Sequence, residues 1–536
     1  MKNKLIKYLA GILVIAIVAS SCAKKLDLYP VNDLTPEKAF STPAGYKSVL
    51  AKIYGTLAIT GNAGPAGSPD ISGGLDEGSQ VPYIRMFFNC QELPTDEAVV
   101  AWNDQTIHDF HNLKWTSADP FLKGIYARPI YNVTLINEYM RESTDAKLAE
   151  RGITGADAAE IKKSVAEVRF LRAFNYWIMM DLFGKSTFIT EADLVGTSLP
   201  KEIGRAALFQ YIESELKAID GDLAAAKTIE YGRVDQGAAW ALLARMYLNA
   251  GVYTGTTRYT DAITYAKKVI AAGYTLYSGY PRVFMADNDK AKDEFMFAVN
   301  CDGLRTKGYG NTTFLVHASC GDEIADYGII EGWYGYRATS ALVNLFSDPT
   351  GATDKRAQFT TSKYGTSPAQ LTITDISNFD QGPHVIKYVN KRSDGAPVSD
   401  ATKYFSDIDF PVFRLSEMYL IYAEAVLRGG TGGTTATAAS YINLMRTRAY
   451  GNSSGNISEA ALSLQFILDE RARELYWEGH RRTDLIRYGL LTTGTYLWPW
   501  KGGVASGTAV DSKYNLFPVP ASNLVANPNL TQNTGY

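Results

Sequence analysis

Apolar residues recur with helical spacing in several separate blocks of the chain. In "FLRAFNYWI", positions 170, 173, 174, 177 and 178 follow the i, i+3, i+4, i+7, i+8 pattern that places them on one face of a helix. Further helices are predicted over residues 208–219, 240–248, 262–270, 415–426, 438–449 and 459–479. Trp177 and Trp240 fall on such apolar faces, and we predict both to be core residues.

The helices at 240–248 and 262–270 are joined by "NAGVYTGTTRYT", a turn punctuated by glycine. Alanines stand where these helices would approach each other, which is typical of a tetratricopeptide-type hairpin. Between about 274 and 410 no helical period is sustained, and the chain is rich in glycine, aromatic residues and turn signals. The tail "NLFPVPASNLVANPNLTQNTGY" contains three prolines and is predicted to be extended and packed, not helical.

These patterns predict a mostly α fold in a single domain at 37–536. A right-handed, tetratricopeptide-like scaffold of helical hairpins is expected at about 121–273 and 411–490. It would carry a loop-rich lobe at about 55–120 and 274–410, and loops on a rigid scaffold are where binding residues concentrate.

The first residues form a targeting signal. A head with three lysines precedes the apolar run "YLAGILVIAIVAS", which is short for a membrane span, and small residues then lead to Cys22. This arrangement resembles a bacterial lipobox, with 1–21 as the signal peptide, Cys22 as the lipidated first residue and 22–36 as a tether. The alternative is an ordinary secretory signal with a chance cysteine. A lipid anchor would hold the protein on a membrane surface.

Charge and cysteine content narrow the class of protein. Removal of residues 1–21 deletes three lysines and no acids, so the formal net charge moves from -3 to -6, which argues against a nucleic-acid partner. The other cysteines, Cys90, Cys301 and Cys320, are too few for a disulfide framework. We predict buried thiols, although Cys301 and Cys320 form a conceivable pair.

Several longer stretches of the chain carry a family resemblance. "LDLYP" after the anchor, "AEVRFLRAFNYWIMMDLFG", "GRVDQGAAWALLARMYLNAG", "ERARELYWEGHRRTDLIRYG" and "FPVPASNLVANPNLTQNTGY" are similar to SusD/RagB outer-membrane lipoproteins, in the order found in that family. Shorter stretches such as "FNCQELPTDE" and "YLWPWKGG" resemble the starch-binding members. The resemblance covers nearly the whole chain after the signal peptide.

The resemblance implies a non-catalytic surface lipoprotein of the outer membrane that faces the cell exterior. Such a protein captures starch or maltooligosaccharides and passes them to a TonB-dependent, SusC-like transporter. The alternative is the same role for a different glycan. No cofactor is required, but the resemblance also suggests a structural calcium involving Asp289, Asp407 and Asp409; solvated loop acids are the competing interpretation.

The resemblance further implies an arc of aromatic rings flanked by planar polar groups. Carried over residue by residue, the carbohydrate-binding positions fall on Trp102, Tyr309, Trp333, Asp76, Arg85 and Asn103. The amide position is the least defined, because the chain is one residue shorter there and Asp104 and Gln105 are close alternatives.

These residue types suit a sugar on physical grounds. An exposed aromatic plane covers the C–H face of a pyranose, while arginine and aspartate replace the water lost from its hydroxyls. Each assignment also has a structural alternative. Trp102 and Trp333 could be core residues of the lobe, Tyr309 could be merely exposed, and Arg85 could form a salt bridge with Asp76.

Catalysis and zinc binding are poorly supported by the sequence. Asp96–Glu97 and Asp322–Glu323 are adjacent acid pairs, whereas glycoside hydrolysis needs two carboxylates facing each other across a cleft. His108 and His111 have a helical ligand spacing but lack a nearby HExxH motif or cysteine cluster. We therefore predict that the protein is not an enzyme.

Overall fold

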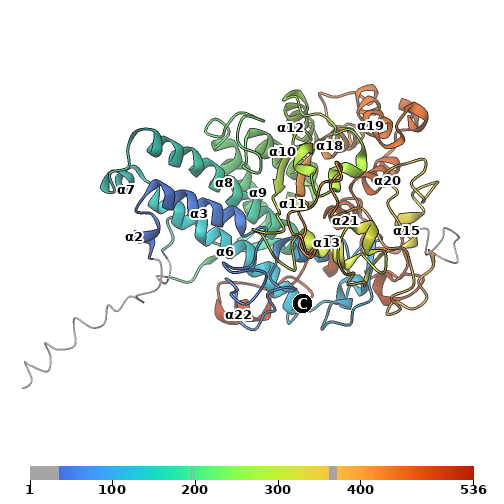
Figure 1. Ribbon diagram of the computed structural model, residues 1–536, viewed down its shortest axis with the longest axis horizontal. Coiled ribbons are helices and arrows are strands. Elements are labelled where there is room, and N and C mark those ends of the chain that lie inside the picture. The colour runs from blue at the N-terminus through green and yellow to red at the C-terminus, as the bar shows by residue number, and fades with distance from the viewer. Residues whose placement is uncertain (1–34, 195, 197, 361–370) are drawn as a thin grey trace, which may run out of the picture.

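The structure is a computed structural model that describes residues 35–194, 196, 198–360 and 371–536. The signal peptide, Cys22 and most of the tether lie outside the described residues. The described chain is mostly helical, and helices extend across the whole width of the molecule with loops between and around them (Figure 1). No helix in the described ranges is both long and apolar enough to span a bilayer.

The scaffold is a series of helices that pack mainly on their neighbours along the chain. α6 packs against α8, α8 against α9, α10 against α12, α12 against α18, and α18 against α19. Their bounds are α6 Pro120–Glu142, α8 Gly155–Phe183, α9 Arg205–Ala218, α10 Gln236–Leu248, α12 Tyr259–Ala271, α18 Leu415–Leu427, α19 Thr435–Tyr450 and α20 Leu464–Leu475. These helices contain or overlap the predicted helical segments and confirm the mostly α class.

Polar caps fix where these helices begin. The carboxylate of Asp119 accepts hydrogen bonds from the first backbone amides of α6, and Asp235 and Ser463 cap α10 and α20 in the same way. α8 ends at Gly184, whose φ of 68° is unfavourable for most other residues. Local sequence therefore sets the ends of the helices as well as their apolar faces.

The remaining elements are distributed over both the scaffold and the lobe. The shorter helices are α2 Pro36–Ala39, α3 Pro43–Gly55, α4 Tyr83–Gln91, α5 His108–Asn112, α7 Asp145–Glu150, α11 Ala250–Thr254, α13 Thr312–Ala318, α14 Ile324–Tyr327, α15 Ser340–Val343, α21 Arg481–Arg487 and α22 Ala521–Ala526. The strands are β1 Ala98–Val100, β2 Lys185–Phe188, β3 Lys201–Gly204, β4 Phe295–Val299, β5 Tyr336–Ala338 and β6 Phe410–Arg414.

Three antiparallel pairs join segments of the chain: β1 with β5, β2 with β3, and β4 with β6. In the first pair, Val100 lies opposite Tyr336 and Ala98 opposite Ala338. The pairing of β4 with β6 brings the loop after Val299 toward the segment before Phe410. The β1–β5 and β4–β6 pairs therefore each hold two distant segments of the chain beside each other.

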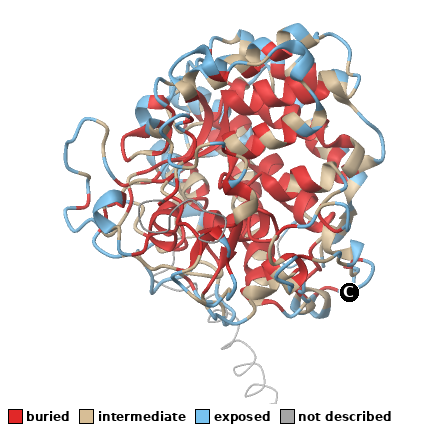
Figure 2. Cartoon of the chain, turned by 90° about the vertical axis from the view of Figure 1, so that its right-hand side faces the viewer, coloured by how far each residue is buried: buried red, intermediate tan, exposed pale blue. Residues whose placement is uncertain are grey.

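Buried residues run through the centre of the molecule, and exposed ones lie mainly at its periphery (Figure 2). Trp177 is 2% exposed, as predicted for a core position. Trp240 is only partly buried, because its indole N–H reaches out to donate to Asp220 at 2.6 Å. The predicted thiols Cys90, Cys301 and Cys320 are all free and buried.

Two predictions about secondary structure near the C-terminus were wrong. The helix expected over 459–479 is interrupted near its start and stops at Leu475, because Trp477 adopts a left-handed backbone conformation with φ 63°. The tail expected to be wholly extended contains the short helix α22, which starts directly after Pro520. Proline restricts only its own φ and favours the start of a helix, so a proline-rich segment can still contain one.

The scaffold also contains a buried network of charges. The Arg414 guanidinium contacts Glu474, Glu478 and Glu294 at 2.6–3.3 Å, and all four side chains are at most 2% exposed. Arg448, Arg356 and Lys387 extend the network through the same carboxylates. Each buried charge therefore has an opposite charge beside it, which offsets the cost of removing it from water.

Candidate functional site

Trp102 is placed by the β1–β5 pair. It follows β1 directly, and Ala101 N–H donates to the Gly335 carbonyl at 2.8 Å, which continues the ladder by one step. The indole N–H of Trp102 donates to the Trp333 carbonyl at 3.1 Å. Gly335 has a φ of 101°, and a Cβ at that position would collide with the Trp102 indole. A glycine is needed here so that the ring can lie against the backbone.

Trp102 is half-buried. Its ring packs edge-to-face on Tyr336 at 5.1 Å between centroids, and the Arg85 guanidinium lies 5.4 Å from it. These contacts hold one part of the indole while another part stays accessible. Trp102 is thus neither a fully buried core residue nor a freely moving surface residue.

The second tryptophan and the tyrosine lie close to this ring. Trp333 packs on His317 at 4.7 Å, and its indole N–H donates to Glu331 at 3.2 Å. The Tyr309 ring lies 6.4 Å from the Trp333 ring, and both residues are half-buried. The structure therefore gathers Trp102, Trp333 and Tyr309 in one neighbourhood, held by a tryptophan–carbonyl bond and a ring contact.

Arg85 lies under this group in α4. The residue is 7% exposed, and its guanidinium stacks on Phe314 at 4.9 Å as well as on Trp102. Among the described residues, Arg85 donates one long hydrogen bond, 3.4 Å from Nη1 to the Gly78 carbonyl, and its Nε has no partner. Burial lowers the pKa of Arg85, and the nearby carboxylates of Asp104 and Asp76 partly oppose that shift.

Asp76 stands at the exposed edge of the group. Its carboxylate accepts hydrogen bonds from the backbone amide of Ser79 at 2.7 Å and from the Ser79 hydroxyl at 2.6 Å. No ion pair joins Asp76 to Arg85 in the described structure, so the salt-bridge alternative for this pair is wrong. Gly78 links them: it contacts Tyr309 on one side and offers its carbonyl to Arg85.

The amide position stays open among three neighbours. Asn103, Asp104 and Gln105 are all exposed, and none of their side chains makes a hydrogen bond to another described residue. Asn103 follows Trp102 directly, which keeps it within the group. The structure brings all six predicted carbohydrate-binding residues together, while their contact with sugar stays a prediction.

Relatives of known name share this chain's full length. It is 37% identical to the starch-binding protein SusD of Bacteroides thetaiotaomicron over 584 aligned residues, with 100% of both chains covered. The chain belongs to the SusD family. The SusD family model matches residues 293–536, and SusD-like protein P2 of Formosa agariphila is 26% identical over 73% of this chain and 77% of its own.

Solved structures of the SusD superfamily have the same fold. Surface glycan-binding protein A of Bacteroides thetaiotaomicron, in complex with laminarihexaose, matches with a TM-score of 0.68 and 18% identity over 91% of this chain and 99% of that one. A SusD superfamily protein of the same organism matches with a TM-score of 0.68 and 21% identity over 92% and 99%. The recognition of the family and its helical architecture are thus confirmed.

Two aromatic residues beside the SusD-family arc were missed by sequence reasoning. The Tyr404 ring lies 6.0 Å from Tyr309, the Phe405 ring lies 5.9 Å from it, and both are half-buried. Burial and the neighbouring Glu331 carboxylate raise the pKa of Tyr404 to about 12. The β4–β6 pairing brings them here across about a hundred residues of chain, and nothing in the local sequence signals that approach.

The predicted calcium ligands have other partners. Asp407 accepts hydrogen bonds from the backbone amides of Gly303 and Ser399, and Asp409 accepts from Cys301 N–H and Tyr231 O–H. Asp289 is exposed, and the described residues hold no cluster of three or more His, Cys, Asp or Glu side chains arranged for a metal. The structure offers no ready-made cage, and the calcium stays a prediction.

Of the acid and histidine pairs considered in the sequence, Asp96, Glu97 and His111 are buried, His108 and Glu323 are half-buried, and Asp322 is exposed. Asp96 and Glu97 are 1% and 2% exposed, and Asp96 is bonded to Arg481 at 2.6 Å and 2.7 Å. A carboxylate held in this way cannot reach a sugar in solvent. Burial lowers the pKa of His111 to about 3, so this ring stays neutral at physiological pH.

Proposed function

We propose that this SusD-like glycan-binding protein captures starch or maltooligosaccharides at the arc formed by Trp102, Trp333 and Tyr309. One observation supports it above all: three half-buried rings stand beside a buried arginine that forms no ion pair with the described residues. The rings would cover the C–H faces of successive glucose units. The full-length identity with a starch-binding relative supports the choice of α-glucan.

Arg85 would do two things in this site. Its stacking between Trp102 and Phe314 fixes the guanidinium plane, and its Nη groups would donate to sugar hydroxyls. A hydroxyl that loses water without a new partner costs roughly 1–3 kcal/mol, so a preset donor is valuable. Asp76 and Asn103, both exposed, would supply acceptors and an amide at the rim.

The site supports binding without catalysis. Asp96 and Glu97 are buried, and Asp96 is paired with Arg481. Asp322 and Glu323 are neighbours in sequence, not two carboxylates on opposite walls of a cleft. A shallow arc would also leave much of the ligand in water. Affinity per site would be modest, since ordering a flexible sugar offsets part of the contact energy. A polymer that engages many anchored copies would still be held firmly.

Delivery and location complete the proposal. Cys22 would carry a lipid that anchors the protein to the outer membrane, with the arc facing the cell exterior. The bound oligosaccharide would pass to a TonB-dependent, SusC-like transporter. Replacement of Cys22 by serine should release the protein from the membrane fraction and leave sugar binding by the purified chain unchanged.

Calorimetric titration tests the central claim. The chain without residues 1–22 would be titrated with maltoheptaose, α-cyclodextrin and laminarihexaose. Binding of the first two alone is the expected result. Binding of laminarihexaose alone would favour the alternative of another glycan, for which the fold match to a laminarihexaose complex gives a precedent. Silence with all three ligands would overturn the α-glucan assignment.

A further inference from the structure

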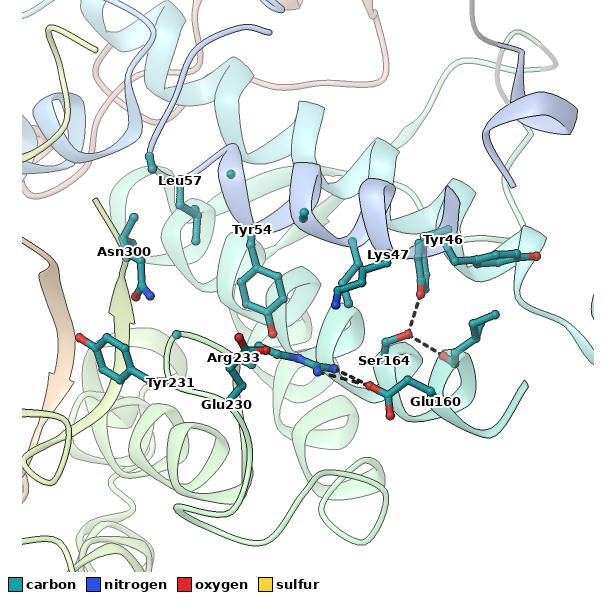
Figure 3. A pocket seen from close by; sticks show the side chains of 18 of the residues that line it. Tyr46, Lys47, Tyr54, Leu57, Glu160, Ser164, Glu230, Tyr231, Arg233 and Asn300 are labelled. Carbon is teal, nitrogen blue, oxygen red and sulfur yellow. Dashed lines mark hydrogen bonds and ion pairs between the residues drawn. The ribbon is translucent and has the colours of Figure 1, made fainter. Parts of the chain in front are cut away.

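A second concave region lies on the scaffold side of the molecule. It is a groove of about 550 Å³ between α3 and the first half of α8, closed at one end by the loop Glu230–Arg233 and the edge of β4 (Figure 3). One face of α3 forms a wall, since its lining residues recur every three or four positions: Pro43, Tyr46, Lys47, Leu50, Ala51 and Tyr54.

The floor of the groove is apolar. Leu50, Leu57, Ile161 and Phe297 line it and are between 2% and 9% exposed. Because apolar floors favour ligands that bring carbon surface, the groove suits a molecule with an extended hydrocarbon face.

Tyrosines add ring surface whose polar ends are already bonded. The half-buried Tyr54 donates its hydroxyl to Glu167 at 2.7 Å, and the half-buried Tyr231 donates its hydroxyl to Asp409 at 2.8 Å. Figure 3 shows Tyr54 in the middle of the groove and Tyr231 at its far end. With these hydroxyls occupied, it is the ring surfaces that can meet a ligand.

The rim offers uncommitted polar groups. Lys47, Asp157, Glu230 and Asn300 are exposed, and their side chains make no ion pair or hydrogen bond with the described residues. Together they provide an ammonium, two carboxylates and an amide. This mixture of donors and acceptors above a ring-lined floor matches the needs of sugar hydroxyls above sugar C–H faces.

The groove is continuous with the arc along the chain. A smaller cavity of about 100 Å³ is lined among others by Thr60, Leu304 and Lys307. These residues lie within a few positions of Ala58 and Thr306, which line the groove. Thr306 lines the groove, Lys307 lines the smaller cavity, and Tyr309 of the arc is two residues further along the chain. This segment therefore runs from the end of the groove to the arc.

We propose that this groove is a second saccharide site, which takes a short neutral oligosaccharide end-on to the chain held by the arc. The inference rests on the proposed function and deepens it. A peptide segment is the competing occupant, because it too could use the apolar floor and bond to the rim. The continuity of the groove with the arc along the chain favours a saccharide.

A variant that removes the arc isolates the groove. In the full chain carrying Trp102→Ala and Trp333→Ala, we expect weak binding of maltotriose to persist in a calorimetric or NMR titration. Ala51 is exposed on the α3 wall, so Ala51→Arg would obstruct the groove without disturbing the core. Ser48 is also exposed on α3 but does not line the groove, which makes Ser48→Arg the matched control.

The expected result is that Ala51→Arg, and Asn300→Ala separately, weaken the residual binding at least about fivefold while Ser48→Arg leaves it unchanged. If the arc variant showed no residual binding while the wild type bound normally, the second site in the groove would be overturned and the proposed function would stand. If neither protein bound the sugar, both the second site in the groove and the proposed function would be overturned. Association with a protein that Ala51→Arg abolishes, without any sugar binding, would reassign the groove to a peptide.

Discussion

Arg414 and Arg85 are both buried, yet the structure treats them in opposite ways. Arg414, in the scaffold, contacts three buried carboxylates. Arg85, in the lobe, has no carboxylate within ion-pair distance and leaves Nε without a partner. Burial lowers the pKa of Arg85. Burial also acts to lower the pKa of Arg414, but the neighbouring carboxylates outweigh that effect and raise the pKa overall. The scaffold uses its charges internally, whereas the lobe keeps bonding capacity for a ligand.

Replacement of Arg414 by leucine should have the largest effect. It would leave Glu474, Glu478 and Glu294 buried with one positive partner fewer, and we expect the free energy of unfolding to fall by about 3–5 kcal/mol. Urea denaturation followed by circular dichroism would measure the change. Arg305→Leu, which removes the exposed pair with Asp302, is the control and should cost less than about 1 kcal/mol. Equal losses of stability in Arg414→Leu and Arg305→Leu would contradict the assignment of Arg414 to a stabilising buried network.

Replacement of Arg85 by methionine should separate binding from stability. The methionine keeps apolar contact with Trp102 and Phe314, so the urea midpoint should move little. Affinity for maltoheptaose should fall about 5- to 150-fold, because the sugar hydroxyls lose a charged donor. Arg85→Lys, which keeps the charge without the planar fork, should fall between the two. A large loss of stability with unchanged affinity would show that Arg85, like Arg414, stabilises the fold and does not bind the ligand.

The junction between the two regions should respond to pH. Glu92 follows α4, and its carboxylate accepts from the backbone of Gly479 at 2.6 Å. Burial raises the pKa of Glu92 to about 7, above its ordinary value of 4.5. The native protein thus binds this proton more tightly than the unfolded chain, so its contribution to stability is complete below pH 4.5 and is lost as the pH rises through 7.

Glu92→Gln should remove that loss. The glutamine oxygen can still accept from Gly479, and its amide can donate to the coupled carboxyl of Glu97. We expect the variant to gain about 1–3 kcal/mol over the wild type between pH 5 and pH 8. Unfolding curves at both pH values would measure the gain. A constant difference across this range would show that Glu92 does not titrate there.

Calcium should have the smallest effect. Burial raises the pKa of Asp409 to about 7, and the carboxylates of Asp289 and Asp407 contribute to the shift, so a nearby cation would favour the ionised form. Because Asp407 and Asp409 already accept backbone hydrogen bonds, we expect millimolar calcium to raise the Tm by no more than about 2 °C. Asp289→Asn should abolish the rise, and a rise that survives this substitution would place the ion elsewhere.

The sequence predicted the scaffold better than the lobe for a physical reason. Helices such as α8 and α18 are specified by local periodicity, which can be seen in ten to twenty residues. The arc depends on β1 and β5, strands of three residues each that meet across more than two hundred residues of chain. Such short strands carry no readable alternation, so only the family resemblance pointed to Trp102 and Trp333 together.

Local sequence patterns also could not predict which residues of the lobe are buried. Arg85 was expected at a ligand surface, but α4 is buried along its whole length, and no periodicity reveals that a polar helix face will be covered. Tyr404 and Phe405 escaped notice because they join the arc only through the β4–β6 pair. Sequence patterns report local propensity, whereas these positions are decided by tertiary contacts.

Gly335 has a consequence for anyone who wishes to redesign the ligand preference. The Trp102 indole occupies the space that any side chain at 335 would need, and the backbone there has a φ of 101°. Glycine and tryptophan at these positions are therefore locked together and form a poor target for random mutagenesis. A directed-evolution library should hold both fixed and vary Asn103–Gln105, Glu331 and Tyr404, where the chain can explore new specificities without first repairing its backbone.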